Sequence, residues 1–235
     1  MANQHPAYMA AAAKTVASRL GADLPPTGHT HTRAMAGVIE HLAGAAETLG
    51  TLYDRQSPTD TVSMHQKKVG AASKAFGEVV ARARAQLNEI MQRGMRDIEE
   101  RSRAKTGLRP NEFAAEVRAS VRNMGFDEKL TLFNDLAKEG RGAELSAVID
   151  APPLLSGVTP DMQQRAKDML ESFHAAAEKQ ERELLASAFG QAFDMTTNAA
   201  TVATHMGDPR LLAEIEQGEA AAAAAVQAFQ QATRG

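Results

Sequence analysis

The chain has 235 residues, of which 43% are hydrophobic, 4% aromatic and 23% charged, and its formal net charge is −3. Alanine supplies 46 residues, whereas cysteine and tryptophan are absent. The lack of cysteine excludes disulfides, cysteine-based zinc sites and thiol nucleophiles, and a pI near 6.2 argues against a dedicated nucleic-acid-binding protein.

The hydrophobic pattern predicts an all-α protein, because apolar residues recur every three or four positions and strand-like alternation is missing. The expected architecture is an elongated helical bundle, or a coiled-coil-like hairpin of two long helices with shorter flanking helices. Alanine buries little area per residue, so the core is expected to be thin for this length.

Residues 1–56 are expected to hold two helices joined by a proline- and glycine-rich loop. The first helix spans Tyr8 to Leu20, the loop includes Leu24 to Gly28, and the second helix spans about Arg33 to Arg55.

Residues 57–106 are expected to form one long basic amphipathic helix. Ser57 can cap its start, Pro58 suits the first helical position, and Asp60 falls where a capping box places its acid. No helix breaker follows until Gly107, so the helix has roughly 45 residues and is about 65–70 Å long. Its apolar stripe gives four candidate interface residues, Phe76, Val80, Leu87 and Ile90.

Residues 107–158 are expected to contain short helices, at Asn111 to Met124, Asp127 to Lys138 and Ala143 to Ile149. Residues 159–235 then hold a long acidic helix and an alanine-rich C-terminal helix. Thr159, Pro160 and Asp161 repeat the start signal, the long helix runs to about His205, and the last helix spans Arg210 to Ala232. The acidic helix adds three candidate interface residues, Phe173, Phe189 and Phe193.

Charge is unevenly distributed along the chain. Residues 62–125 carry 13 basic and 7 acidic groups, whereas residues 126–235 carry 9 and 17. This asymmetry favours antiparallel pairing of the two long helices within one chain, or head-to-tail pairing between copies.

No catalytic or cofactor motif can be found, so the sequence predicts a protein that is not an enzyme and holds no cofactor or metal. His29 and His31 could contribute to a metal site only with further ligands from elsewhere, and a solvated loop is the expected alternative. Glu171 and His174 form one Glu-x-x-His pair, whereas a di-iron bundle needs two.

A basic cluster raises an alternative function, a helical regulatory or nucleic-acid-associated module that contacts phosphates. Acidic residues are interleaved with the cluster and no aromatic residue lies close enough in sequence to stack bases, so we expect solvated or protein-paired side chains. The cluster comprises Arg93, Arg96, Arg101, Arg103, Lys105 and Arg109.

The N-terminus lacks the basic start and long apolar run of a signal peptide, and no uncharged stretch reaches the roughly 18 residues of a membrane span. We therefore expect no secretion by a signal peptide and no membrane insertion.

The segment from Ala143 to Gly157, with the sequence AELSAVIDAPPLLSG, resembles a segment of helical structural proteins of bacteriophages and prophages. In those proteins a short helix ends in a similar Ala-Pro-Pro turn before a long helix; here Leu154 stands where an aromatic residue is expected. The resemblance covers 15 of 235 residues and implies a non-enzymatic virion or virion-assembly protein.

Together, the resemblance and the long apolar stripes lead to one hypothesis. The protein is expected to be a repeated component of a phage particle, as a minor capsid, connector or scaffold-like protein. Its expected partners are its own copies, capsid proteins or portal proteins, in the virion or in the bacterial host cytoplasm during assembly.

Overall fold

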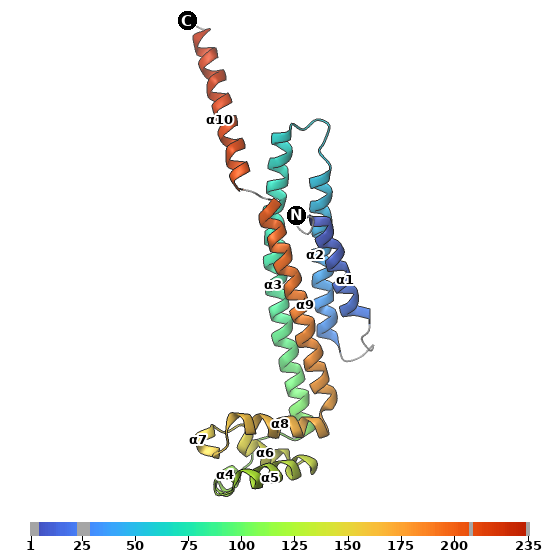
Figure 1. Cartoon of the computed structure of the whole chain (residues 1–235), viewed down its shortest axis with the longest axis vertical. Helices are drawn as coiled ribbons and strands as arrows, with labels where there is room; N and C mark the ends of the chain where they lie inside the picture. Colours follow the sequence, from blue (N-terminus) through green and yellow to red (C-terminus); the bar gives the residue numbers. More distant parts are fainter. Residues whose placement is uncertain (1–4, 23–28, 207–208, 234–235) are drawn as a thin grey trace. The chain divides into compact units, whose positions relative to one another are not determined.

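The computed structural model describes residues 5–22, 29–206 and 209–233, and within these residues it contains ten helices and no strand (Figure 1). The all-α prediction is therefore confirmed. The helices are α1 (Pro6–Ala22), α2 (Thr30–Asp54), α3 (Val62–Thr106), α4 (Ala114–Arg122), α5 (Phe126–Lys138), α6 (Gly142–Ile149), α7 (Pro153–Ser156), α8 (Pro160–His174), α9 (Ala176–Met206) and α10 (Pro209–Ala232). The predicted loop from Leu24 to Gly28 lies outside the described residues.

The chain divides into two compact units. Unit 1 comprises Met1–Ile90 with Ala188–Gly235, and unit 2 comprises Met91–Ser187. The two longest helices, α3 and α9, therefore contribute their residues 62–90 and 188–206 to unit 1 and their remaining residues to unit 2.

Unit 1 is a bundle in which α1 packs against α2, and α3 packs against α9 (Figure 1). The α3 and α9 segments are antiparallel, because Ser73 donates a hydrogen bond to the Ala203 carbonyl (2.5 Å) while Arg84 Nε donates to Thr196 Oγ1 (3.1 Å). A position later in α3 thus meets a position earlier in α9. The predicted antiparallel hairpin of two long helices is present in this unit.

The core of unit 1 joins larger residues on α2 and α3 to small residues on α9. Along α3 the buried positions follow a spacing of four and three, at Val69, Ser73, Phe76, Val80, Ala83 and Leu87. Along α9 they are Ala188, Ala192, Thr196, Ala199 and Val202. We call this second set the alanine seam; small side chains of this kind allow two helices to approach closely.

The alanine seam gives a first testable prediction. Replacing the fully buried Ala192 by leucine is expected to lower the free energy of unfolding by about 1–3 kcal/mol, because a well-packed core cannot take the added volume. The matched control is Ala85→Leu at an exposed position of α3, with an expected change within about 0.5 kcal/mol. Urea denaturation measures both; equal effects would contradict a tightly packed seam.

Unit 2 has its own hydrophobic core beneath short helices. Phe133, Leu145 and Leu170 are almost completely buried and come from α5, α6 and α8. The remaining members of the core are Leu108, Val121, Leu136, Ala137, Val148, Val158, Met162 and Ala166. The three short helices predicted for this region correspond to α4, α5 and α6, and the one-turn helix α7 was not predicted.

The predictions for the two long helices are wrong in one detail each: the start of the first, and the continuity of the second. The helix expected from Pro58 begins at Val62, because residues 57–60 form a turn and Thr61 Oγ1, rather than Ser57, accepts from the backbone N–H of Met64 (3.2 Å). The single helix expected from Pro160 to His205 is two helices, α8 and α9, separated at Ala175 (φ −138°, ψ 35°).

Candidate interaction surfaces

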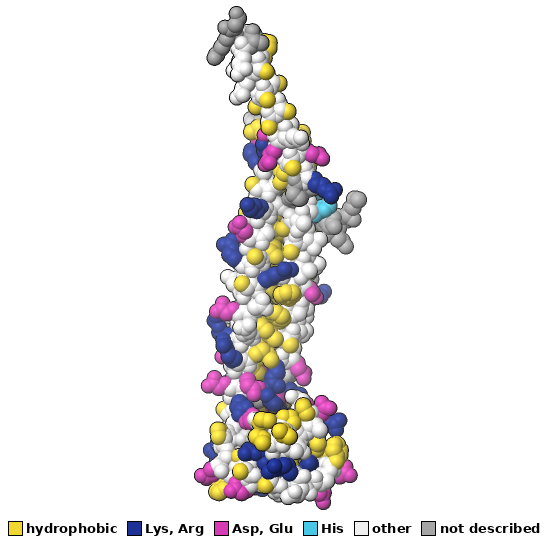
Figure 2. All heavy atoms as spheres, turned by 90° about the vertical axis from the view of Figure 1, so that its left-hand side faces the viewer, with side chains coloured by type: hydrophobic (Ala, Val, Ile, Leu, Met, Phe, Trp, Pro, Cys, Tyr) yellow, Lys and Arg dark blue, Asp and Glu magenta, His cyan; other side chains and the backbone are white. Residues whose placement is uncertain are grey.

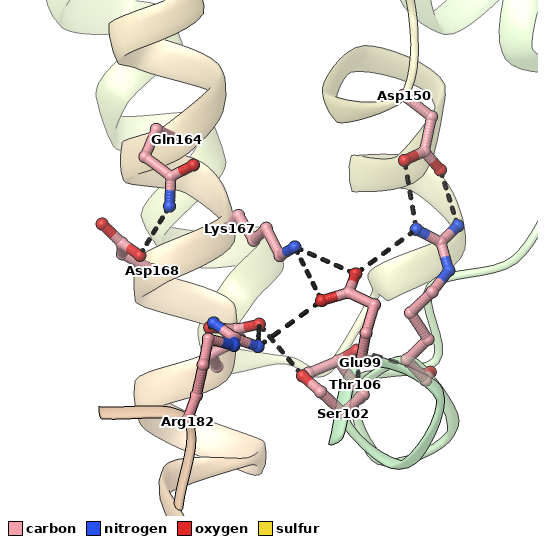
Figure 3. A network of polar contacts seen from close by, with 10 residues as sticks. Glu99, Ser102, Thr106, Asp150, Gln164, Lys167, Asp168 and Arg182 are labelled. Carbon is pink, nitrogen blue, oxygen red and sulfur yellow. Dashed lines mark hydrogen bonds and ion pairs between the residues drawn. The ribbon is translucent and has the colours of Figure 1, made fainter. Parts of the chain in front are cut away.

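A network of charged side chains lies inside unit 2 (Figure 3). At its centre is the fully buried carboxylate of Glu171. Arg182 donates two hydrogen bonds to it, from Nη1 to Oε2 (2.9 Å) and from Nη2 to Oε1 (2.8 Å). The hydroxyl of Ser102, which is also buried, donates to Oε1 (3.0 Å). Both carboxylate oxygens are therefore satisfied by fixed donors.

The break at Ala175 is what makes this ion pair possible. Glu171 and Arg182 are 11 positions apart, and in one straight helix they would be separated by about 16 Å along the axis. Since the direction of the chain changes at Ala175, the guanidinium of Arg182 on α9 reaches the carboxylate of Glu171 on α8.

Glu99 of α3 extends the network to a second set of cations (Figure 3). Lys167 Nζ donates to both of its carboxylate oxygens (2.9 and 3.0 Å), and Arg182 Nη2 lies 3.5 Å from Oε2. Arg103 pairs with Asp150 through two bonds of 2.9 and 3.2 Å and lies 4.0 Å from Glu99. Ion pairs thus connect four elements of unit 2, namely α3, α8, α9 and the C-terminal end of α6.

Burial and hydrogen bonding have opposite effects on Glu171. Burial alone would raise the pKa of its carboxyl group, but the two hydrogen bonds from Arg182, with help from Ser102, hold this pKa below its ordinary value. Glu178 behaves in the same way, since burial raises its pKa and the ion pair with Lys105 lowers it, with the net effect a decrease. Both groups are therefore ionised at neutral pH.

Half of the predicted phosphate-contacting residues take part in ion pairs within unit 2. Arg101 pairs with Glu181, Lys105 with Glu178 at 2.7 Å, and Arg103 with Asp150. Arg93 also has a partner. Arg96 and Arg109 are exposed. Much of the positive charge of this cluster is therefore balanced by acidic residues of the same unit, as the charge asymmetry of the sequence favoured.

The predicted interface residues differ in burial. Phe76, Val80 and Leu87 are buried in unit 1, whereas Ile90, Phe189 and Phe193 are half-buried and Phe173 is 52% exposed. The two phenylalanines of α9 contact each other at 5.6 Å between ring centroids, and the guanidinium of Arg84 lies 5.4 Å from the Phe193 ring. These two rings flank the alanine seam instead of forming it.

A turn in unit 2 presents leucine side chains to solvent. Residues 151–157, the Ala-Pro-Pro-Leu-Leu-Ser-Gly part of the resembling segment, fold around α7, and Leu154 is 89% exposed and Leu155 51% exposed. We call this element the Pro-Leu-Leu turn. Pro152 precedes the helix, and Gly157 ends it with φ +64°, a left-handed conformation that favours glycine.

Side chains from two other helices, and one from the turn itself, hold the Pro-Leu-Leu turn in place. Gln163 of α8 donates to the carbonyls of Val148 (2.8 Å) and Ala151 (2.7 Å). Lys129 of α5 donates to the carbonyl of Gly157 (2.9 Å). Ser156 is fully buried and accepts from the Val158 N–H (3.3 Å). The exposed leucines therefore stand on a backbone that is anchored on both sides.

A shallow groove of about 330 Å³ adjoins the turn. Leu155 forms one wall, and Arg118 and Asp150 supply charge; the other lining residues are Pro110, Asn111, Ala114, Ser146, Ala147, Ala151 and Pro152. Figure 2 shows hydrophobic side chains gathered beside basic ones on one face of unit 2. A surface of this composition is suited to a protein partner with an apolar contact and a polar rim.

A second exposed apolar surface is on α10 of unit 1. All described side chains from Gln217 to Gln231 are exposed, including Val226 at 56% and Phe229 at 70%. Figure 2 shows hydrophobic side chains on the surface of this helix.

The candidate metal residues are not brought together. His29 precedes α2 and His31 lies in its first turn, so the expectation of a loop around both is wrong for His31. Among the described residues, no three His, Asp or Glu side chains form a metal-binding group. In the same residues, no helix combines the length and apolarity that crossing a bilayer requires.

Comparison of the chain with models of protein families, with curated proteins and with solved structures finds no match. The resemblance of residues 143–157 to phage structural proteins therefore stays a prediction. The sequence alone did not identify Glu171, Arg182 or the exposed leucines as a site, although the Pro-Pro and Ser-Gly pairs around Leu154 mark a turn.

Proposed function

We propose that the protein is a non-enzymatic structural protein, a repeated component of a bacteriophage particle, acting as a minor capsid, connector or scaffold-like protein. Its partners are further copies of itself and capsid or portal proteins, in the virion or in the host cytoplasm during assembly. The observation that carries this proposal is the Pro-Leu-Leu turn, which holds Leu154 89% exposed on an anchored backbone.

Exposure of one leucine is common, but exposure on a turn whose backbone is anchored by hydrogen bonds has a physical consequence. Hydrogen bonds from Gln163 to the Ala151 carbonyl and from Lys129 to the Gly157 carbonyl hold the two ends of the Pro-Leu-Leu turn while its leucines point outward. A preorganised apolar side chain loses little conformational entropy when a partner covers it. The turn therefore has the properties of a docking point for another protein.

Two further observations support a structural role. The turn belongs to the segment that resembles phage structural proteins, so the resemblance and the exposed surface coincide. The ionic network around Glu171 is satisfied by residues of unit 2 itself, which is consistent with a role in stabilising the fold.

The experiment is incorporation into particles. In the bacterium that carries this coding sequence, a phage deleted for the gene is supplied with the wild-type protein or with Leu154→Ser/Leu155→Ser, and quantitative mass spectrometry counts its copies in gradient-purified particles. The wild-type protein is expected in a fixed copy number, and the double variant at least ten-fold below it. Thermal unfolding of the double variant should match the wild type, because both side chains are exposed.

The matched control is Leu184→Ser, at a 40% exposed leucine of α9 away from the turn, which should be incorporated normally. Absence of the wild-type protein from both mature and immature particles would overturn the proposed function. Normal incorporation of the double variant would show that the turn is not the docking point.

A further inference from the structure

The apolar stripe of α10 has a regular heptad spacing over the whole helix. Successive positions three and four residues apart place the stripe on one face, as in helices that form coiled coils. The stripe consists of Leu212, Ile215, Glu219, Ala222, Val226 and Phe229.

The first half of this stripe contacts α3 of the same chain at Leu212 and Glu219. Leu212 packs closely on Gly70 of α3. A Cβ atom added at Gly70 would lie 2.7 Å from Cδ1 of Leu212. Glu219 accepts hydrogen bonds from Ser63 Oγ (2.9 Å) and from Lys67. Because α3 begins at Val62, no further turn of it remains to cover the stripe beyond Glu219. The same face continues through Val226 and Phe229, where it is exposed.

The exposed half carries no charge. From Ala220 to Thr233 there is no acidic or basic residue, and the positions that flank the stripe are Ala223, Ala225 and Gln230. In a pair of identical helices a charged flanking residue commonly meets a like charge, which repels the second copy. Glu219, the one acidic member of the stripe, is directed to Lys67 of its own chain. The exposed half is thus suited to an identical partner.

We propose that the exposed half of α10 pairs antiparallel with the same segment of a second copy of this chain. In a parallel pair, the first half of the second α10 would lie beside Leu212 and Glu219. α3 of the same chain already occupies that position. In the antiparallel pair, Val226 faces Phe229 of the second copy and Ala222 faces Thr233. Each helix then ends beside the point where α3 of the other copy begins.

The paired segment is short. About 12 residues per chain form a contact about 18 Å long, which buries less than the roughly 1,200 Å² of a stable complex. The pairing is therefore weak for two free molecules and becomes effective where copies are held near one another. This inference rests on the proposed function, because a repeated component of a particle holds copies of the chain near one another.

Single cysteines test the orientation directly, because the chain contains no cysteine of its own. In the antiparallel pair, two Ala222 positions are about 16 Å apart along the axis, beyond the roughly 7 Å limit for Cα atoms of a disulfide. Oxidation of A222C alone should therefore yield only monomer, whereas an equimolar mixture of A222C and T233C should yield a cross-linked heterodimer. Cross-linking of A222C with itself would overturn the antiparallel orientation, and no cross-linking in either sample at millimolar protein would overturn the pairing.

Two substitutions on opposite faces of α10 test whether the stripe forms the contact. Phe229→Glu is expected to raise the dissociation constant in sedimentation equilibrium at least ten-fold, while Ala224→Glu, on the opposite face of α10, leaves it within two-fold. Circular dichroism checks that both retain their helix content. Equal dissociation constants for the two variants would contradict pairing through the stripe. Particle incorporation is measured separately, so a failure of this pairing is distinguishable from a failure of the proposed function.

Discussion

Replacing Arg182 by methionine is expected to lower the free energy of unfolding by about 3–5 kcal/mol, because it leaves the fully buried carboxylate of Glu171 without its main partner. Ser102 supplies only one hydrogen bond and no charge. The measurement is urea denaturation at pH 7. The matched control is Arg165→Met, at an exposed position of α8, with an expected change within about 0.5 kcal/mol.

In the Arg182→Met variant, the contribution of Glu171 to the free energy of unfolding should change with pH in the opposite direction. In the wild-type protein the pKa of Glu171 is lowered in the folded state, so its contribution to stability is present above the pKa of the unfolded chain and is lost as the pH falls through the folded-state value. Without Arg182, burial raises the pKa instead, and the folded state is disfavoured as the pH rises through that value. Between pH 4 and 7 the variant should lose stability with rising pH.

A double variant separates the ion pair from its surroundings. Glu171→Leu combined with Arg182→Met should recover much of the lost stability, since buried ion pairs are often replaceable by apolar residues. If Arg182→Met alone proves as stable as the wild type, Glu171 does not depend on this guanidinium.

Gly142→Ala is expected to destabilise unit 2 by about 3 kcal/mol or more, because the added Cβ has no space. It would lie 1.9 Å from the carbonyl oxygen of Thr106 and 2.7 Å from the carbonyl carbon of Gly107. Both neighbours are backbone atoms, so the start of α6 must move away from the end of α3, at the upper end of the cost of overpacking.

The control for this substitution is Gly190→Ala in α9, where a Cβ meets nothing within 4 Å. That change should be neutral or stabilise the protein by up to about 1 kcal/mol, because alanine favours a helix more than glycine does. Thermal unfolding compares the two, and similar melting temperatures for both variants would contradict the close backbone approach at Gly142.

Helix existence could be predicted from the sequence because it depends on local spacing. The stripe of Phe76, Val80 and Leu87 predicted a long helix near residues 57–106, and α3 spans Val62–Thr106. The break at Ala175 could not be predicted, since no glycine or proline marks it. The contact that accompanies the break is tertiary, since the carboxylate of Glu171 and the guanidinium of Arg182 come together only after the turn.

The candidate surfaces were predictable only in part. The Pro-Pro pair before Leu154 indicated a turn, but not that Gln163 and Lys129 would anchor it from two other helices. The interface candidates Phe189 and Phe193 each lie one position after a buried alanine, Ala188 or Ala192, because a phenylalanine outweighs an alanine in any hydrophobic pattern. In unit 1 the small residues are buried and the rings lie at the side, since only small residues permit the close approach of α3.

The alanine seam of α9 has a consequence for the alignment of its two helices. Alanine side chains have no rotamers, so burying them costs no side-chain entropy, yet one alanine fits almost as well as the next. A displacement of α9 by one helical turn along α3 would therefore change the apolar contacts of the seam little. The hydrogen bonds from Ser73 to Ala203 and from Arg84 to Thr196 do not tolerate such a displacement. Two polar contacts thus select one alignment among several that the apolar surface alone would accept.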